Sequence, residues 1–161
     1  MPNWCLNRLT IEHDDVTMIE EFVEAYKRGE TCEHYIPTPK NADGSLHDDW
    51  WDYRVNNWGT KWDIGSYQDE SGGLHPTVVD NQASVSFDSA WSPPIGLYER
   101  LHELGFKVEA TYWEPGMCFA GRWIDGDDQY YDNVGNYKEF PQDLIEEYNM
   151  DEFYEDEEEA V

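Results

Sequence analysis

The strongest constraint on the fold is a strand pattern followed directly by a helix pattern, an order that occurs twice. Residues 4–12 show the two-residue period of a strand with one buried face. In residues 16–28 the apolar side chains recur at three- and four-residue steps, the spacing of an amphipathic helix. The order returns with a strand over residues 83–88 and a helix over residues 95–104. Helices and strands therefore belong to one mixed fold.

Two further strands follow the second helix, over residues 106–113 and 117–124, joined by a hairpin turn at 114–116. An irregular, aromatic-rich insertion at about residues 30–80 separates the two strand–helix units, and within it residues 61–67 form a candidate strand. This element order is typical of a split βαβ sandwich. We predict an α+β, ferredoxin-like fold in which two helices cover one face of an antiparallel sheet.

The 161 residues suffice for one domain, which we place at residues 1–139, followed by an acidic tail at residues 140–161. Apolar side chains at its start predict a short helix, and the final glutamate run is expected to be disordered. The tail holds ten acids and no base, namely Asp143, Glu146, Glu147, Asp151, Glu152, Glu155, Asp156, Glu157, Glu158 and Glu159.

The net charge of −26 bounds the possible partners, because such a chain repels nucleic acid and anionic lipid and attracts basic proteins. Without the tail, 26 acids against ten bases still leave −16, beyond the roughly 2–8 charges that favour solubility. No apolar run reaches the length of a membrane span, and the N-terminus lacks a signal-peptide pattern, so a cytoplasmic location is expected. Three cysteines without metal-ligand spacing, Cys5, Cys32 and Cys118, predict reduced thiols, two of them packed.

The segment Asn-Trp-Gly-Thr-Lys-Trp-Asp at residues 57–63 is the densest candidate site. Its Asn57, Trp58, Lys61, Trp62 and Asp63 are possible ligand-binding residues, since indoles can stack on a ligand and the lysine can contact an anion. A structural role is the alternative, in which the indoles cover the sheet while the asparagine and aspartate bind loop backbone groups.

Two acidic clusters are candidate metal sites, and neither has a complete ligand set. The first, which lacks a second histidine, comprises His47, Asp48, Asp49 and Asp52. The second, Asp125, Asp127 and Asp132, has Tyr130 and Asn136 where a calcium loop needs glycine and glutamate. No nucleophile–base motif or phosphate-binding glycine loop is present either. We predict no metal, no cofactor, no catalytic residue and no enzymatic activity.

Four blocks of residues, in order, resemble the YubB-type ferredoxin-like domain family and span residues 2–121. They are Pro2–Cys5 with Asn7 and Leu9; residues 57–63; Ala90–Pro94; and Tyr112 with Glu114–Gly116 and Phe119–Gly121. The resemblance implies a ferredoxin-like fold and a setting in phages, plasmids or bacterial accessory genes. It supplies no catalytic residue, and the acidic tail lies outside it.

The favoured functional hypothesis is a non-catalytic, phage- or plasmid-type accessory protein that binds and inhibits a basic host or defence protein. The partner would be a nucleic-acid-binding protein, its cleft occupied by carboxylates that mimic nucleic acid. The partner-binding surface would comprise the ten tail acids together with Asp125, Asp127 and Asp128. The alternative is an aromatic-lined module that binds a small ligand or peptide, centred on residues 56–63.

Overall fold

The computed structural model describes residues 3–65, 76–132 and 136–159. Its strands are β1 (Trp4–Glu12), β2 (Thr77–Val79), β3 (Gln82–Ala90), β4 (Lys107–Glu114), β5 (Phe119–Ile124) and β6 (Asp127–Asp132). Its helices are α1 (Val16–Lys27), α2 (Thr31–Tyr35), α3 (Trp50–Asn57), α4 (Ile95–Glu103), α5 (Gln142–Glu147) and α6 (Met150–Glu159), with a 3₁₀ turn at Tyr137–Glu139. No helix among these residues is both long and apolar enough to cross a membrane.

The six strands form one antiparallel sheet in the order β2-β3-β1-β4-β5-β6. Helix α1 connects β1 to β2, with β3 lying between those two strands, and α4 connects β3 to β4 across β1. These two crossovers are the split βαβ units of a ferredoxin-like sheet, which β5 and β6 extend. The predicted α+β fold is confirmed.

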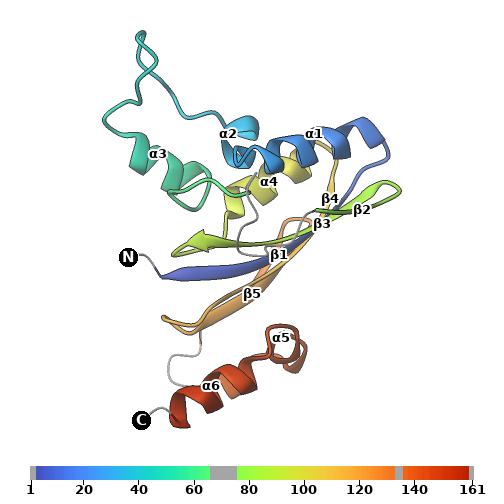
Figure 1. Ribbon diagram of the computed structural model, residues 1–161, viewed down its shortest axis with the longest axis vertical. Coiled ribbons are helices and arrows are strands. Elements are labelled where there is room, and N and C mark those ends of the chain that lie inside the picture. Colours follow the sequence, from blue (N-terminus) through green and yellow to red (C-terminus); the bar gives the residue numbers. More distant parts are fainter. Residues whose placement is uncertain (1–2, 66–75, 133–135, 160–161) are drawn as a thin grey trace.

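The main core lies between the sheet and the layer of α1 and α4 (Figure 1). Strand β1 is central, and its alternate residues Cys5, Leu9 and Ile11 are buried. The buried stripes of both helices pack above them, with Phe22 from α1 and Leu101 from α4 both inaccessible to solvent. The periodicity of strand and helix thus specifies this face of the molecule.

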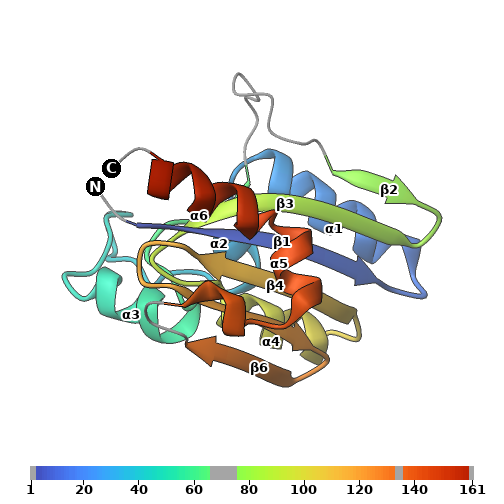
Figure 2. The same cartoon turned by 90° about the horizontal axis from the view of Figure 1, so that it is seen from below.

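The opposite face of the sheet corrects one expectation. This face is covered by the tail, because α5 and α6 lie across it, as Figure 2 shows from below. The backbone is also helical as far as Glu159, where a disordered glutamate run was expected. The physical reason is that apolar side chains on this face, such as those of Trp113 and Ala120, need a cover, and Leu144 and Met150 supply it.

The insertion is more ordered than its irregular sequence suggested. Helices α2 and α3 both lie in it, and the short strand β2 pairs with β3 near its end. The candidate strand at residues 61–67 is wrong for residues 61–65, which form turns and irregular backbone; residues 66 and 67 lie outside the described part. The cause is that this segment hydrogen-bonds to α2 and to Arg54 of α3 instead of to a neighbouring strand.

Candidate functional site

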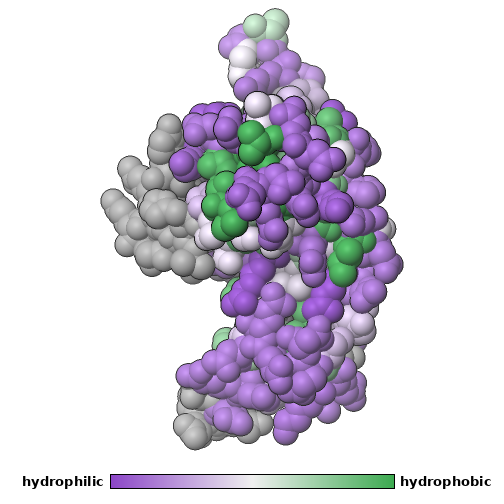
Figure 3. Space-filling model, turned by 90° about the vertical axis from the view of Figure 1, so that its right-hand side faces the viewer, coloured by the Kyte–Doolittle hydropathy of each residue, from purple (hydrophilic) through white to green (hydrophobic). Residues whose placement is uncertain are grey.

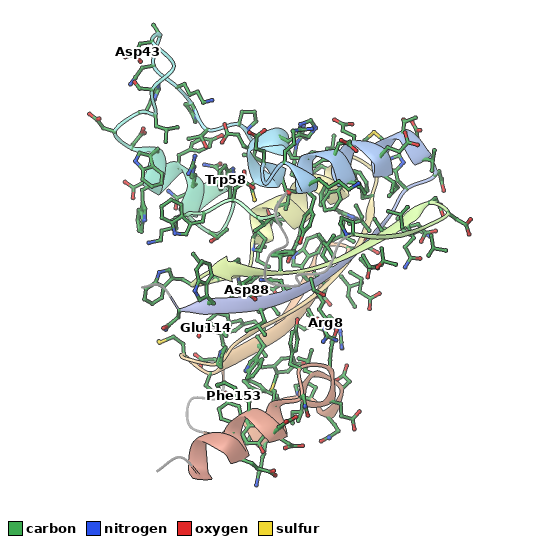
Figure 4. The ribbon with its side chains drawn as sticks, viewed as in Figure 1. Arg8, Asp43, Trp58, Asp88, Glu114 and Phe153 are labelled. Atoms are coloured by element: carbon green, nitrogen blue, oxygen red, sulfur yellow. The ribbon has the colours of Figure 1, made fainter. Side chains whose placement is uncertain are left out.

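Trp58, the residue directly after α3, is a core residue. Its side chain is 0% exposed, and its indole Nε1–H donates to the Ile36 carbonyl at 2.8 Å. The Arg54 guanidinium lies over the same ring, 4.6 Å from its centroid. In Figure 4 the residue lies within the helix layer. Trp58 is therefore structural, and it belongs to the core between the sheet and the helix layer.

Residues 58–60 are fastened to the segment that leads into α4. The Thr60 hydroxyl donates to the Ala90 carbonyl at 2.9 Å, and the Ser92 hydroxyl donates to the Gly59 carbonyl. The Gly96 N–H donates to the Trp58 carbonyl at 3.0 Å. Residues 58–60 and residues 90–96 therefore form one joint, which links the end of α3 to the start of α4.

We expect Gly96→Ala to loosen this joint. An added Cβ would lie 1.8 Å from the Asn57 carbonyl oxygen, which is backbone and cannot move without shifting α3. Such overpacking costs about 1–3 kcal/mol of unfolding free energy, measurable by urea denaturation. Glu99→Ala, on the exposed side of the same helix, is the matched control and should change stability little. An unchanged midpoint for Gly96→Ala would show that the joint is not tightly packed.

Asp63 is also structural. Its carboxylate accepts the backbone N–H groups of Cys32 at 2.6 Å, Glu33 at 2.9 Å and Ile64 at 2.8 Å. It thereby satisfies two free donors at the start of α2, a helix separated from it by about thirty residues of chain. The carboxylate has no remaining role as a ligand group.

Arg54 is a structural residue that the sequence analysis missed. It is stacked between Trp50 and Trp58, with its Cζ atom 5.0 Å and 4.6 Å from the two ring centroids. Its Nε donates to the Thr38 hydroxyl at 3.1 Å, and its guanidinium lies 3.9 Å from Glu33. One cation thus holds α3 against α2. Nothing in the local pattern distinguished it from a solvated arginine.

Lys61 and Trp62 are the members of the predicted set that remain at the surface with the exposed Asn57. Trp62 is 45% exposed, and the Lys61 Nζ lies 5.5 Å from the centroid of its ring. Within the described residues Lys61 has no carboxylate partner. Asn57 donates to the Tyr53 carbonyl of its own helix at 2.8 Å. The five candidates do not form one binding site.

Helices α5 and α6, here called the acidic layer, are docked on the sheet by apolar side chains. Leu144 and Met150 are 0% exposed and pack with Trp113 of β4. The Trp113 ring also meets the rings of Phe153, at 5.2 Å between centroids, and Tyr148, at 5.8 Å. Figure 4 shows Phe153 on the sheet-facing side of α6. The tail is therefore amphipathic, with a buried side and an acidic side.

Two arginines of the sheet anchor the acidic layer. Arg8 stacks on Tyr148, 5.2 Å from the ring centroid, and lies 3.8 Å from Glu147. Arg122 donates to the Asp143 carboxylate, and this hydrogen bond holds the pKa of Asp143 below its ordinary value. Glu147 also accepts from the Thr111 hydroxyl at 3.0 Å. Glu147 and Asp143 thus attach the acidic layer to the sheet, whereas the sequence analysis predicts that they bind the partner.

The outer side of the acidic layer carries carboxylates that have no cation partner within the described residues. Glu146, Asp151, Glu152 and Glu155 are exposed. Asp151 accepts from the Tyr137 hydroxyl at 2.7 Å, which holds its carboxylate in place. In Figure 3 the lower lobe of the molecule is almost entirely hydrophilic. For Asp156, Glu157, Glu158 and Glu159 the structure describes the helical backbone.

The three predicted acids near the β5–β6 turn do not act together. Asp125 accepts the Val108 N–H at 2.8 Å and lies 3.6 Å from His102 of α4, on the face of the sheet that α1 and α4 cover. Asp128 accepts the Tyr112 hydroxyl at 2.6 Å, also on that face. Because side chains alternate along a strand, Asp127 lies on the opposite face, which α5 and α6 cover, near the strand position that holds Arg122. Only Asp127 extends the acidic layer.

The remaining candidates have structural surroundings. Cys5 and Cys32 are fully buried, and burial raises the pKa of both thiols, which makes them poor nucleophiles. Cys118 is half-buried and accepts from the Tyr154 hydroxyl at 3.5 Å. Among the residues described, no three of the His, Cys, Asp and Glu side chains are grouped so as to hold a metal ion.

Comparison with known proteins gives one structural neighbour. No family model matches the chain, and no curated protein matches it. The crystal structure of the protein api92 from Yersinia pseudotuberculosis, with the family model DUF1281, aligns with 84% of this chain and 99% of its own. The two chains are 11% identical, with a TM-score of 0.46.

Proposed function

We propose that this chain is a non-catalytic binding protein whose acidic layer occupies the basic nucleic-acid-binding surface of a partner protein and blocks it. The observation that carries the proposal is the docking of α5 and α6 on the sheet through Leu144, Met150 and Trp113. A solubilising tail needs no such contacts. An acidic layer with a buried inner side presents its outer carboxylates from a fixed backbone.

Fixed presentation favours binding, because less conformational entropy is lost when the partner arrives. Arg8 and Arg122 strengthen the attachment and are themselves neutralised by Glu147 and Asp143. The outer surface therefore keeps a single sign of charge. The tail sequence from residue 139 onward contains no base that could pair with a free carboxylate.

The charge spacing of α6 is comparable with that of duplex DNA. The helix runs from Met150 to Glu159 and carries seven acids. At about 1.5 Å per residue it is roughly 15 Å long, or about one charge per 2 Å. B-DNA carries one charge per about 1.7 Å of its axis. A cleft lined with lysine and arginine would thus meet a similar density of negative charge.

The proposed partner is a host or defence protein that binds DNA or RNA, and the proposed setting is the bacterial cytoplasm. The resemblance of the chain to the YubB-type family implies that it is encoded by a phage, a plasmid or another mobile element. Binding through charge gives fast association and a strong dependence on salt. Direct binding of nucleic acid is not proposed, because a net charge of −26 opposes it.

Capture from a bacterial lysate tests this function. The immobilised 161-residue chain should retain nucleic-acid-binding proteins at low salt, release them at high salt, and lose them to added duplex DNA. Captured proteins are identified by mass spectrometry. Retention of no nucleic-acid-binding protein, or retention unaffected by salt and DNA, would contradict the proposal.

A second candidate function is the binding of a small ligand or peptide at residues 56–63. The half-exposed Trp62, with Lys61 over its ring, favours it, while Trp58 and Asp63 are used by the fold. A ligand at this position would quench tryptophan emission with little dependence on salt, and Trp62→Phe would remove the quenching. This function is separated from the first if the ligand quenches the emission of the unchanged chain but not that of Trp62→Phe.

A further inference from the structure

Helix α3 has an inner side fixed by the fold and an outer side that is exposed to solvent. None of its eight residues is fully buried, and Arg54 with Trp50 forms its attachment. Trp51 and Val55, four residues apart, lie one above the other on a different side and are 48% and 36% exposed. Tryptophan is among the side chains most enriched at the energetic centres of protein contacts.

Acidic side chains border this pair. Asp48 lies in the turn directly before the helix, three residues from Trp51, and Asp52 precedes Val55 by three residues, a spacing that makes the two neighbours on the helix surface. Neither carboxylate has an ion pair or hydrogen bond within the part of the chain that the structure describes. Both are therefore available to pair with an incoming cation. The carboxylates thus favour a positively charged group, and the exposed indole favours one that also has an apolar or planar surface.

Other indoles of the same region already bind positively charged side chains over their rings. The Arg54 guanidinium lies between the rings of Trp50 and Trp58, and the Lys61 ammonium lies over Trp62. Trp51 is an indole of the region to which no cation of the described chain is bound. Arginine suits it best, because a guanidinium stacks flat on an indole while its N–H groups reach a carboxylate.

We propose that the Trp51–Val55 side of α3 is a docking surface for an arginine-bearing segment of a protein partner. The guanidinium stacks on Trp51 and pairs with Asp48 or Asp52, while Val55 contacts the neighbouring apolar atoms of the segment. This surface lies in the helix layer above the sheet, whereas the acidic layer lies below it (Figure 1). The two surfaces are separate, so this proposal does not depend on the function of the acidic layer.

The test follows the indole N–H signals of the isotope-labelled chain by NMR. The probe is a short acetylated and amidated glycine–arginine peptide, and the control is the same peptide with citrulline in place of arginine. We expect the Trp51 signal, assigned through its loss in Trp51→Phe, to shift in a saturable way with the arginine peptide only. The Trp58 signal should stay fixed, because its N–H is bound to the Ile36 carbonyl.

Charge variants localise the effect. Asp48→Asn with Asp52→Asn should weaken the peptide at least about fivefold at Trp51, and an unmoved Trp58 signal reports that the fold is intact. Neutralising Glu146, Asp151, Glu152 and Glu155 should leave the Trp51 titration unchanged. An unshifted Trp51 signal, an equal shift with citrulline, or a shift lost on neutralising the acidic layer would overturn the proposal.

Discussion

Trp58→Ala is expected to lower the free energy of unfolding by about 3–5 kcal/mol, the range for deleting a buried large aromatic side chain. The substitution removes a fully buried indole and leaves the Ile36 carbonyl without its donor. It also removes one of the two rings between which Arg54 is held. The loss is therefore expected to spread from α3 to α2 and α4. Urea denaturation followed by circular dichroism measures it.

Trp51→Ala is the matched control, since it deletes the same side chain from the exposed side of the same helix. We expect it to change the unfolding free energy by less than about 0.5 kcal/mol. An unchanged denaturation midpoint for Trp58→Ala would mean that residues 57–63 are not built into the core. Their role as a ligand site would then regain its support.

Leu144→Ala is expected to cost about 2–5 kcal/mol, mainly in the docking of the acidic layer. Leu144 is 0% exposed and lies in the cluster between α5 and the sheet. That cluster is separate from the core under α1 and α4, so local detachment should precede global unfolding. Cys118 reports it, because its thiol lies against Tyr154 of α6.

The measurement is the rate at which a thiol reagent modifies Cys118 in the native protein. Leu144→Ala should raise this rate at least about tenfold, since each 1.4 kcal/mol increases the open population tenfold. The buried Cys5 and Cys32 should stay unmodified under the same conditions. Glu146→Ala, on the outer side of α5, should leave the rate unchanged. Equal rates in all three proteins would indicate that the tail is not docked.

Periodicity predicted the parts of the fold whose burial is regular along the chain. Strand β1 and helices α1 and α4 each bury one repeating side, and the sequence pattern follows that side directly. The ferredoxin-like arrangement followed from their order. Helix α3 escaped prediction because none of its residues is fully buried. Its attachment is the contact of Arg54 with two rings, for which the sequence has no period.

The sites were harder to predict because their contacts join distant residues. Asp63 caps a helix some thirty residues away, and Gly96 meets the end of α3 across a similar span of chain. In the tail, Leu144 and Met150 stand among acids and resemble the apolar positions of a solvated helix. The exposed side of β4–β5 that they cover is evident only once the sheet is assembled. The division of the acids into attaching and free carboxylates follows from that docking.

The most direct measurement of the acidic layer's role is inhibition of DNA binding by a captured nucleic-acid-binding protein. It compares the unchanged chain with two variants that each lose four charges. The layer variant carries Glu146→Gln, Asp151→Asn, Glu152→Gln and Glu155→Gln. The control carries Asp14→Asn, Glu20→Gln, Glu24→Gln and Glu99→Gln, all at exposed positions outside the acidic layer.

We predict that the unchanged chain displaces the DNA, that the layer variant needs an about tenfold higher concentration to do so, and that the control variant behaves like the unchanged chain. Equal weakening of both variants would mean that only total charge matters. Simultaneous binding of the chain and the DNA to the captured protein would contradict occupation of the nucleic-acid site by the acidic layer.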